Sequence, residues 1–296
     1  MRPRAICICR DDGVCRVVGH ALDSAGVEVE HLAQVPTDPG EVALFVVDRE
    51  TGATSENDLR GVGAPVVLVG NDLEDEGMIN LMHEAPFSHL VRDPADRELG
   101  ITSEKLVSGD LFGLEKYLAK GARVGERVVS TDVEKRAAMH EVIAWAEAIG
   151  ARRPIVHRLA TVIDELLMNA LHDAPRESKP VISIEDELAK KAVLRWGADE
   201  QSIAVSVSDP FGALRQRDVI DHVRRARDER GRPIAGTTED PGAGLGLYLV
   251  LANVASLIVN VDPGHQTEVV CLFDRARPGT RAVTSGVRSL HVFQQH

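Results

Sequence analysis

The 296-residue chain has no apolar run that approaches the roughly 20 residues needed to span a bilayer. It also has no excess of positive charge. Its formal net charge is −12 at pH 7, which argues against general affinity for nucleic acid phosphates. The start, MRPRAICICRDDG, has only five apolar positions before charged residues, too few for a signal-peptide core. These absences predict a cytoplasmic protein with no membrane insertion and no nucleic acid partner.

Cysteine is scarce and follows no metal or redox spacing. The four cysteines form no CxxC pair and have no histidine cluster nearby: Cys7, Cys9, Cys15 and Cys271. Cys7 and Cys9 alternate along a predicted strand, so their side chains face the same side of it. We interpret the cysteines as small buried hydrophobic residues.

The first hundred residues alternate short β-branched runs with segments of helix length. The predicted strands are RAICIC, VEVEHL, ALFVVD, APVVLVG and SHLVRDP, with helices at Val14–Ala25 and near Glu76–Glu84. This alternation predicts a doubly wound α/β domain with a parallel sheet over residues 1–98. The Pro/Gly-rich segment between VEVEHL and ALFVVD is short, so its crossover helix is expected to be small or missing.

The pattern changes near Ile101. We interpret residues 99–130 as a linker that carries a short helix in SGDLFGLEKYLAKG. Residues 131–278 follow as two long helices, a series of strands and two further helices, which predicts an α+β sandwich with helices on a mainly antiparallel sheet. The tail, residues 279–296, has no strong periodicity and is expected to be an extra strand or partly disordered.

Three segments of the second half carry residues suited to nucleotide chemistry. In DELLMNALHDA, Glu165 and Asn169 are four residues apart on a helix and so share a face. A carboxylate can orient or deprotonate a hydroxyl, and an amide oxygen can bind Mg²⁺. Taken alone, the pair is better explained as two ordinary polar residues on a surface helix.

The second segment is the strand end SIAVSVSDPFGAL. Asp209 at the strand tip could accept a hydrogen bond from an adenine amino group, and Gly212 would let the backbone approach the base. An Asp-Pro turn is the plainer alternative. The third segment, EDPGAGLGLYLV, places three glycines before an apolar helix, where backbone N–H groups and the helix dipole favour phosphate. A dinucleotide-binding turn is disfavoured because no strand leads directly into these glycines.

Together, these segments resemble the N-box, G1 box and G2 box of the GHKL ATPase superfamily over about Glu134–Asp274. The resemblance implies a Bergerat-type fold that binds ATP and Mg²⁺. It also implies that Asn169 ligates Mg²⁺, that Glu165 is the catalytic base or its orienter, and that Asp209 binds adenine. A hydroxyl near the adenine would come from Thr267. The phosphates would be wrapped by the glycine loop: Gly242, Gly244, Leu245 and Gly246.

The sequence departs from the family at the G1 box. The usual pattern is DxGxG, whereas this chain has Asp209-Pro210-Phe211-Gly212. The most similar branch is the anti-sigma-factor serine kinases, whose compact ATPase domain has no phosphoacceptor bundle before the N-box helix. His140-Glu141 is similar to a histidine kinase phosphoacceptor pair, but the usual polar-Pro sequence does not follow it.

The first domain resembles a response-regulator receiver. Asp48 ends ALFVVD, where a receiver carries its phosphorylated aspartate, and Asp11 and Asp12 match its metal-binding acids. Gly70 stands where the receiver hydroxyl would be, and Asp93 stands where its lysine precedes a proline. A negative charge there opposes a phosphoryl group. The resemblance therefore implies a degenerate, flavodoxin-like docking or dimerisation module, with Asp48 as a structural carboxylate or, less favoured, a phosphorylation site.

We therefore expect a bacterial-type signalling protein that binds Mg–ATP and acts as a serine/threonine kinase or anti-sigma-factor-like regulator of protein partners. Homodimerisation is expected by family analogy. Three alternatives remain: a non-catalytic ATP-dependent switch, a histidine kinase, and a scaffold that has lost nucleotide binding through its altered G1 box.

Overall fold

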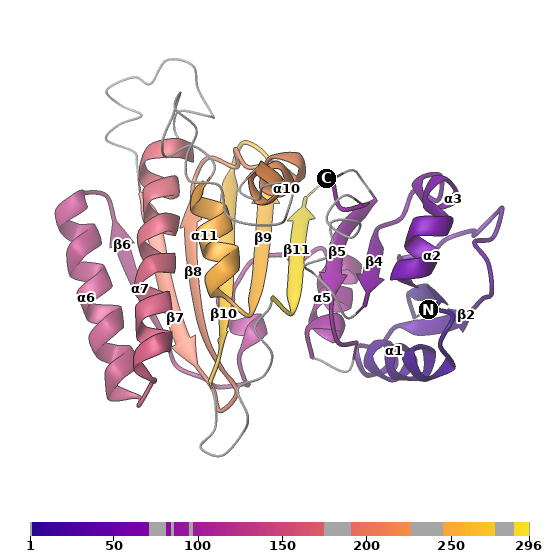
Figure 1. Ribbon diagram of the computed structural model, residues 1–296, viewed down its shortest axis with the longest axis horizontal. Coiled ribbons are helices and arrows are strands. Elements are labelled where there is room, and N and C mark those ends of the chain that lie inside the picture. The colour runs from indigo at the N-terminus through magenta and orange to yellow at the C-terminus, as the bar shows by residue number, and fades with distance from the viewer. Residues whose placement is uncertain are drawn as a thin grey trace. The chain divides into compact units, whose positions relative to one another are not determined.

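A computed structural model describes residues 2–70, 81–83, 86–94, 97–174, 191–225, 245–275 and 287–295 (Figure 1). The chain forms two compact units. The first comprises Met1–Leu111 and Arg288–Phe293, and the second comprises Phe112–Val287 and Gln294–His296. None of the described helices combines the length and the apolar character needed to cross a membrane.

The first unit has a parallel sheet in the order β2-β1-β3-β4-β5. Its strands are β1 (Arg4–Ile8), β2 (Glu28–His31), β3 (Leu44–Asp48), β4 (Val66–Val69) and β5 (Phe87–Val91). The three central strands are buried on both faces, which explains why their sequences are continuous apolar runs rather than alternating ones. The mixed α/β class predicted from these runs is confirmed.

Helices cover both faces of this sheet. On one face, α1 (Asp12–Ser24) packs against α5 (Arg97–Ser108) over a core that includes Cys7 and Val46. On the other, α2 (Arg49–Thr54) continues into α3 (Glu56–Arg60). The connection from β2 to β3 contains no helix, as its short Pro/Gly-rich sequence predicts. The predicted helix near Glu76–Glu84 lies almost entirely outside the described residues.

A strand from the far end of the chain completes the first unit. Strand β11 (Ser289–Gln294) runs antiparallel to β5, with His291 opposite His89 and Ser289 opposite Val91. Of the two forms expected for the tail, these residues adopt the strand, while residues 276–286 lie outside the described part. The second unit is thus inserted in sequence between two parts of the first.

The second unit has an antiparallel sheet in the order β9-β10-β8-β7-β6. Its strands are β6 (Val124–Val129), β7 (Ala192–Ala198), β8 (Ser202–Asp209), β9 (Ser256–Asp262) and β10 (Gln266–Asp274). In the register of β8 with β10, Thr267 lies opposite Asp209. The predicted strand PVISIE lies outside the described residues.

Helices of the second unit lie over one face of this sheet (Figure 1). They are α6 (Asp132–Ala148), α7 (Arg153–Met168), α10 (Gln216–Arg225) and α11 (Leu245–Asn253). Helix α6 begins with a capping box in which Thr131 and Glu134 satisfy each other's backbone N–H groups. This arrangement matches the predicted pattern of helices on a mainly antiparallel sheet.

The segment predicted to be a linker, residues 99–130, has a different structure. It holds most of α5, a 3-10 turn η1 (Leu114–Tyr117) and strand β6, and the two units divide within it, after Leu111. The turn η1 is held to the second sheet by Glu268, which is buried and accepts hydrogen bonds from Gly113 N (2.9 Å) and Asn260 Nδ2 (3.0 Å).

Candidate functional site

The candidate site begins with the polar stripe of α7. One face of this helix is apolar and buried, including Val162, Leu166 and Leu167, while Glu165 and Asn169 are half-buried on the other side. At Asn169 the helix widens into a π-helical turn, η2 (Asn169–Asp173). Such widened turns occur frequently at functional sites because they redirect side chains out of the regular helical spacing.

Glu165 lies in an environment that favours its neutral form. Partial burial is the main cause of a raised pKa for this carboxyl, and the nearby charges of Asp164 and Asp173 raise it further. The ammonium group of Lys135 opposes the shift. A carboxylate with a raised pKa holds a proton more readily than an ordinary surface glutamate, which suits a group that accepts a proton from a substrate.

Helix α11 meets this stripe at its second residue, Gly246. A Cβ atom at this position would lie 2.9 Å from Glu165 Oε2 and 3.5 Å from Asn169 Oδ1. A side chain at this position would have to displace the flexible end of Glu165, so the glycine lets the first turn of α11 lie close to both polar groups. The structure thus brings together the first and third sequence segments that were singled out.

The third segment is described only in part. Helix α11 begins at Leu245, whose side chain is not described. Gly242 and Gly244, with the rest of residues 226–244, lie outside the described residues. Their expected contact with phosphates therefore stays a prediction.

Asp209 ends β8 and is 8% exposed. Its Oδ1 atom accepts a hydrogen bond from Phe211 N at 2.9 Å, as in an Asx turn. Beside it, Thr267 is 3% exposed, and its Oγ1 atom has no hydrogen-bond partner among the described residues. A buried hydroxyl without a hydrogen-bond partner destabilises the fold, so binding of a ligand that forms a hydrogen bond with it would be favoured.

Gly212 makes a different close approach from the predicted one. Its φ is +57°, and a Cβ atom there would collide with the Asp262 carbonyl oxygen and lie 2.6 Å from Gly264 N. Gly264 N also donates a hydrogen bond of 3.2 Å to the Gly212 carbonyl oxygen. Gly212 therefore packs the loop after β8 against the β9–β10 turn, rather than presenting bare backbone on that side.

The two parts of the site adjoin through the sheet. The π-helical turn that starts at Asn169 packs against β8, the strand that ends at Asp209. Helix α11, which carries Gly246, packs against α7 and α10. The described polar groups therefore belong to neighbouring elements of one unit.

Lys135 is a member of this site that the motif analysis missed. It is 8% exposed, and its Nζ atom forms an ion pair of 2.7 Å with Asp164 Oδ1. The signal was present in the sequence, because Lys135 shares the helical spacing of Ala138 and Val142, which are buried on α6. A charged residue at a buried position of a helix indicates a partner on the neighbouring element.

His140 lies on the exposed surface of α6, and its neighbour Glu141 pairs with Arg127 at 2.5 Å. This ion pair gives Glu141 a partner on β6. The histidine kinase alternative stays a prediction.

In the first unit, Asp48 and Asp11 act as helix caps. Asp48 Oδ1 accepts a hydrogen bond from Thr51 N (2.8 Å), and its Oδ2 accepts one from Arg10 N (2.5 Å). Asp11 caps α1 through Gly13 N and Val14 N. Both oxygens of Asp48 thus have structural partners, while its phosphorylation stays a prediction.

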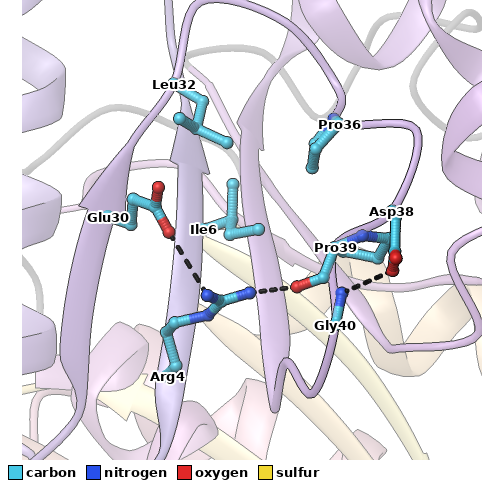
Figure 2. A pocket seen from close by; sticks show the side chains of 8 residues that line it. All are labelled: Arg4, Ile6, Glu30, Leu32, Pro36, Asp38, Pro39 and Gly40. Carbon is cyan, nitrogen blue, oxygen red and sulfur yellow. Dashed lines mark hydrogen bonds and ion pairs between the residues drawn. The ribbon is translucent and has the colours of Figure 1, made fainter.

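A shallow hollow of about 280 Å³ lies in the first unit, beneath the β2–β3 connection (Figure 2). Arg4 crosses it, pairing with Glu30 Oε2 at 3.6 Å and donating a hydrogen bond to the Pro39 carbonyl oxygen. Gly40 N donates to Asp38 Oδ1 at 3.1 Å. These bonds anchor the helix-free connection to the sheet, and none of the predicted site residues lines the hollow.

Comparisons with known proteins give no family assignment. No protein-family model matches the chain, and no curated protein matches it. Among solved structures, a chain in the crystal structure of the SiaB–SiaC complex from Pseudomonas aeruginosa is similar over 50% of this chain and 88% of that chain. The identity is 13% and the TM-score is 0.39, a similarity that carries no argument about activity.

Proposed function

We propose that the second unit binds Mg–ATP in the manner of a GHKL ATPase and acts on protein partners as a serine/threonine kinase or anti-sigma-factor-like regulator. The observation that carries the proposal is the close approach of Gly246 to Glu165 and Asn169. This contact places the start of α11, which three glycines precede in the sequence, beside an acid and an amide on α7. A helix start suits phosphate, the acid suits a proton, and the amide oxygen suits Mg²⁺.

A second observation supports an adenine site at the sheet end. Asp209 and Thr267 are buried side by side, and the Thr267 hydroxyl has no described partner. An acceptor next to a hydroxyl matches the amino group and ring nitrogen of adenine. A base bound there would satisfy a hydroxyl that otherwise stays unpaired.

The proposed roles follow from the chemistry of each group. ATP would supply the phosphoryl group, and Asn169 would hold Mg²⁺ through its amide oxygen. Glu165 would accept the proton of a serine or threonine hydroxyl, aided by its raised pKa. Lys135 would position this region by holding Asp164 beside Glu165.

Calorimetry with Mg–ATP on the full chain tests the proposal. We expect binding that Asn169→Ala weakens sharply and Asp209→Ala abolishes, whereas the exposed control His157→Ala leaves it unchanged. Unchanged affinity in both site variants would refute the site assignment.

Radiolabelled ATP and candidate partner proteins then separate catalysis from switching. Acid-stable label on a partner, lost in Glu165→Gln while ATP binding persists, would support the kinase. Retained ATP binding without any phosphoprotein would favour the non-catalytic switch.

A further inference from the structure

Three of the four cysteines converge in the first unit, although their spacing follows no metal-binding motif. Cys7 lies in β1, Cys9 directly follows that strand, and Cys15 lies in α1. Their sulfur atoms all lie within 4.8 Å of one another, and the Cys7 and Cys9 sulfurs are 3.7 Å apart. Cys7 is buried, while Cys9 and Cys15 are half-buried. In the part of the chain that the structure describes, no other group of three potential metal ligands is this close.

The backbone around the three thiols is fixed by hydrogen bonds. Arg10 N donates to Asp48 Oδ2, which ties the β1–α1 loop to the end of β3. Asp11 caps α1 through two backbone N–H groups. The Cys15 thiol donates to the Cys9 carbonyl oxygen at 3.2 Å. The backbone of the loop is therefore held in place, and only the Cys15 side chain has to leave its bond to the Cys9 carbonyl oxygen, which keeps the cost of ordering the ligands low.

The sulfur spacing suits a thiophilic metal ion. Tetrahedral Zn²⁺ has Zn–S bonds of about 2.3 Å, which places its sulfur ligands roughly 3.8 Å apart. The Cys7–Cys9 separation is already close to that value. The Cys15 sulfur, which lies within 4.8 Å of both, would move closer to complete a three-sulfur set.

The thiols already share a proton network. Cys7 donates its S–H to the Cys9 sulfur, and this bond is the main reason that the pKa of Cys9 is lowered. The same bond and burial raise the pKa of Cys7, and burial raises that of Cys15. The Cys7 and Cys9 thiols are therefore already in direct contact before any cation binds.

We propose that Cys7, Cys9 and Cys15 form a binding site for a soft d¹⁰ metal ion such as Zn²⁺ or Cd²⁺. Binding would replace three S–H protons by three metal–sulfur bonds and release three H⁺ for each ion bound. Because Cys9 and Cys15 are half-exposed, the fourth position of the ion would face solvent. The bound ion would tie the end of β1 to the start of α1.

Titration of the reduced, metal-free full chain with Cd²⁺ tests this proposal through the ultraviolet sulfur-to-cadmium absorption band. We expect one Cd²⁺ per chain, displacement by Zn²⁺, and a rise in thermal stability with either ion. Cys9→Ser and Cys15→Ser should each weaken Cd²⁺ binding by more than about 100-fold, because losing a direct ligand costs more than losing a supporting residue. Circular dichroism would confirm that each variant is folded.

Cys271 supplies the matched control. It is the fourth cysteine, is buried in β10 of the second unit, and belongs to no thiol cluster among the described residues. Cys271→Ser should leave Cd²⁺ affinity and absorption unchanged. The proposal would be overturned if Cys9→Ser bound Cd²⁺ as tightly as the unaltered chain. It would also be overturned if the reduced chain bound no Cd²⁺ but formed a disulfide in mild oxidant, which would assign the thiols to redox chemistry.

Discussion

One buried polar cluster of the first unit and the candidate site of the second unit differ in how their polar groups are paired. In the first, polar side chains from α5, β5 and β11 are buried against one another. Ser289 donates a hydrogen bond to Glu98, Thr102 lies 3.5 Å from His291, and Lys105 Nζ lies 3.7 Å from the ring centroid of Phe293. In the second unit, Glu165 and Asn169 are only half-buried, and the Thr267 hydroxyl has no described partner.

This difference distinguishes polar groups that hold the fold together from polar groups that can bind a ligand. Polar groups that bond one another in a buried cluster fix how β11 packs against β5 and α5, because each group would be costly to leave unpaired. Groups beside a close glycine, with bonding capacity left over, can exchange water for a ligand. The comparison can be tested from both sides.

The largest effect is expected from acid on the first unit. Burial lowers the pKa of His89 to about 3 and holds the pKa of His291 well below its ordinary value. Unfolded histidine has a pKa of about 6.5, so below that pH the unfolded state binds more protons. These histidines should therefore not change the free energy of unfolding above about pH 6.5. Below that pH, each buried histidine should lower the free energy of unfolding by about 1.4 kcal/mol for every pH unit of acidification.

Urea unfolding at a series of pH values measures this slope. His89→Leu should reduce it, whereas His157→Leu, at an exposed position of α7, should not. Equal slopes in the two variants would show that His89 does not contribute.

The second effect compares two strand-end aspartates. Asp209→Asn should weaken Mg–ATP binding on the order of 100-fold, since it removes a charged acceptor from a buried position. Asp48→Asn should leave ATP affinity unchanged but cost about 1 kcal/mol of stability through its weakened cap on α2. Calorimetry and urea unfolding on both variants would distinguish them, and a reversed pattern would exchange the roles assigned to the two aspartates.

Gly212 should show the next largest effect. Gly212→Ala combines a positive φ with a collision against the β9–β10 turn, so we expect a loss of roughly 2 to 3 kcal/mol. Gly150→Ala has φ +78° but nothing within 4 Å of the added methyl group, so it should cost only about 1 kcal/mol. Thermal unfolding of both variants isolates the steric part of the cost.

The smallest effect is expected at Gly246. Gly246→Ala should push the Glu165 carboxylate aside, weakening Mg–ATP binding about tenfold, or about 1.4 kcal/mol, with little change in stability. Gly100→Ala, in α5, meets no atom outside its own helix closer than 3.8 Å, so it should leave Mg–ATP affinity unchanged while stabilising the helix by about 0.5 to 1 kcal/mol. An unchanged affinity in Gly246→Ala would remove the main support for the nucleotide site.

Local sequence patterns were sufficient for most elements of this fold. Continuous apolar runs predicted the strands of the first sheet, and Pro154 near the start of α7 matches its helix start. The spacing of Glu165 and Asn169 predicted their shared face, because helical geometry fixes it. The contact of Gly246 with that face was implied only by the family resemblance.

The features that were not predicted depend on contacts distant in sequence. The pairing of β11 with β5 joins residues 289–291 to residues 89–91, and no local periodicity encodes such a pairing. The same holds for β6, which was assigned to a linker. The three sulfurs meet only because α1 folds back over β1, a geometry that the spacing of Cys9 and Cys15 alone does not reveal.

Because β11 comes from the end of the chain, the first unit can be completed only after the whole chain has been synthesised. A ribosome would release residues 1–111 long before Ser289–Phe293 emerge, so the fifth strand must wait with one edge unpaired while the second unit is made. Exposed edges invite wrong partners. His89 on β5 and Lys105 on α5 lie in that edge region, whereas His291 arrives with β11 itself. While His89 and Lys105 are solvated they disfavour aggregation, and they become buried when the last strand pairs.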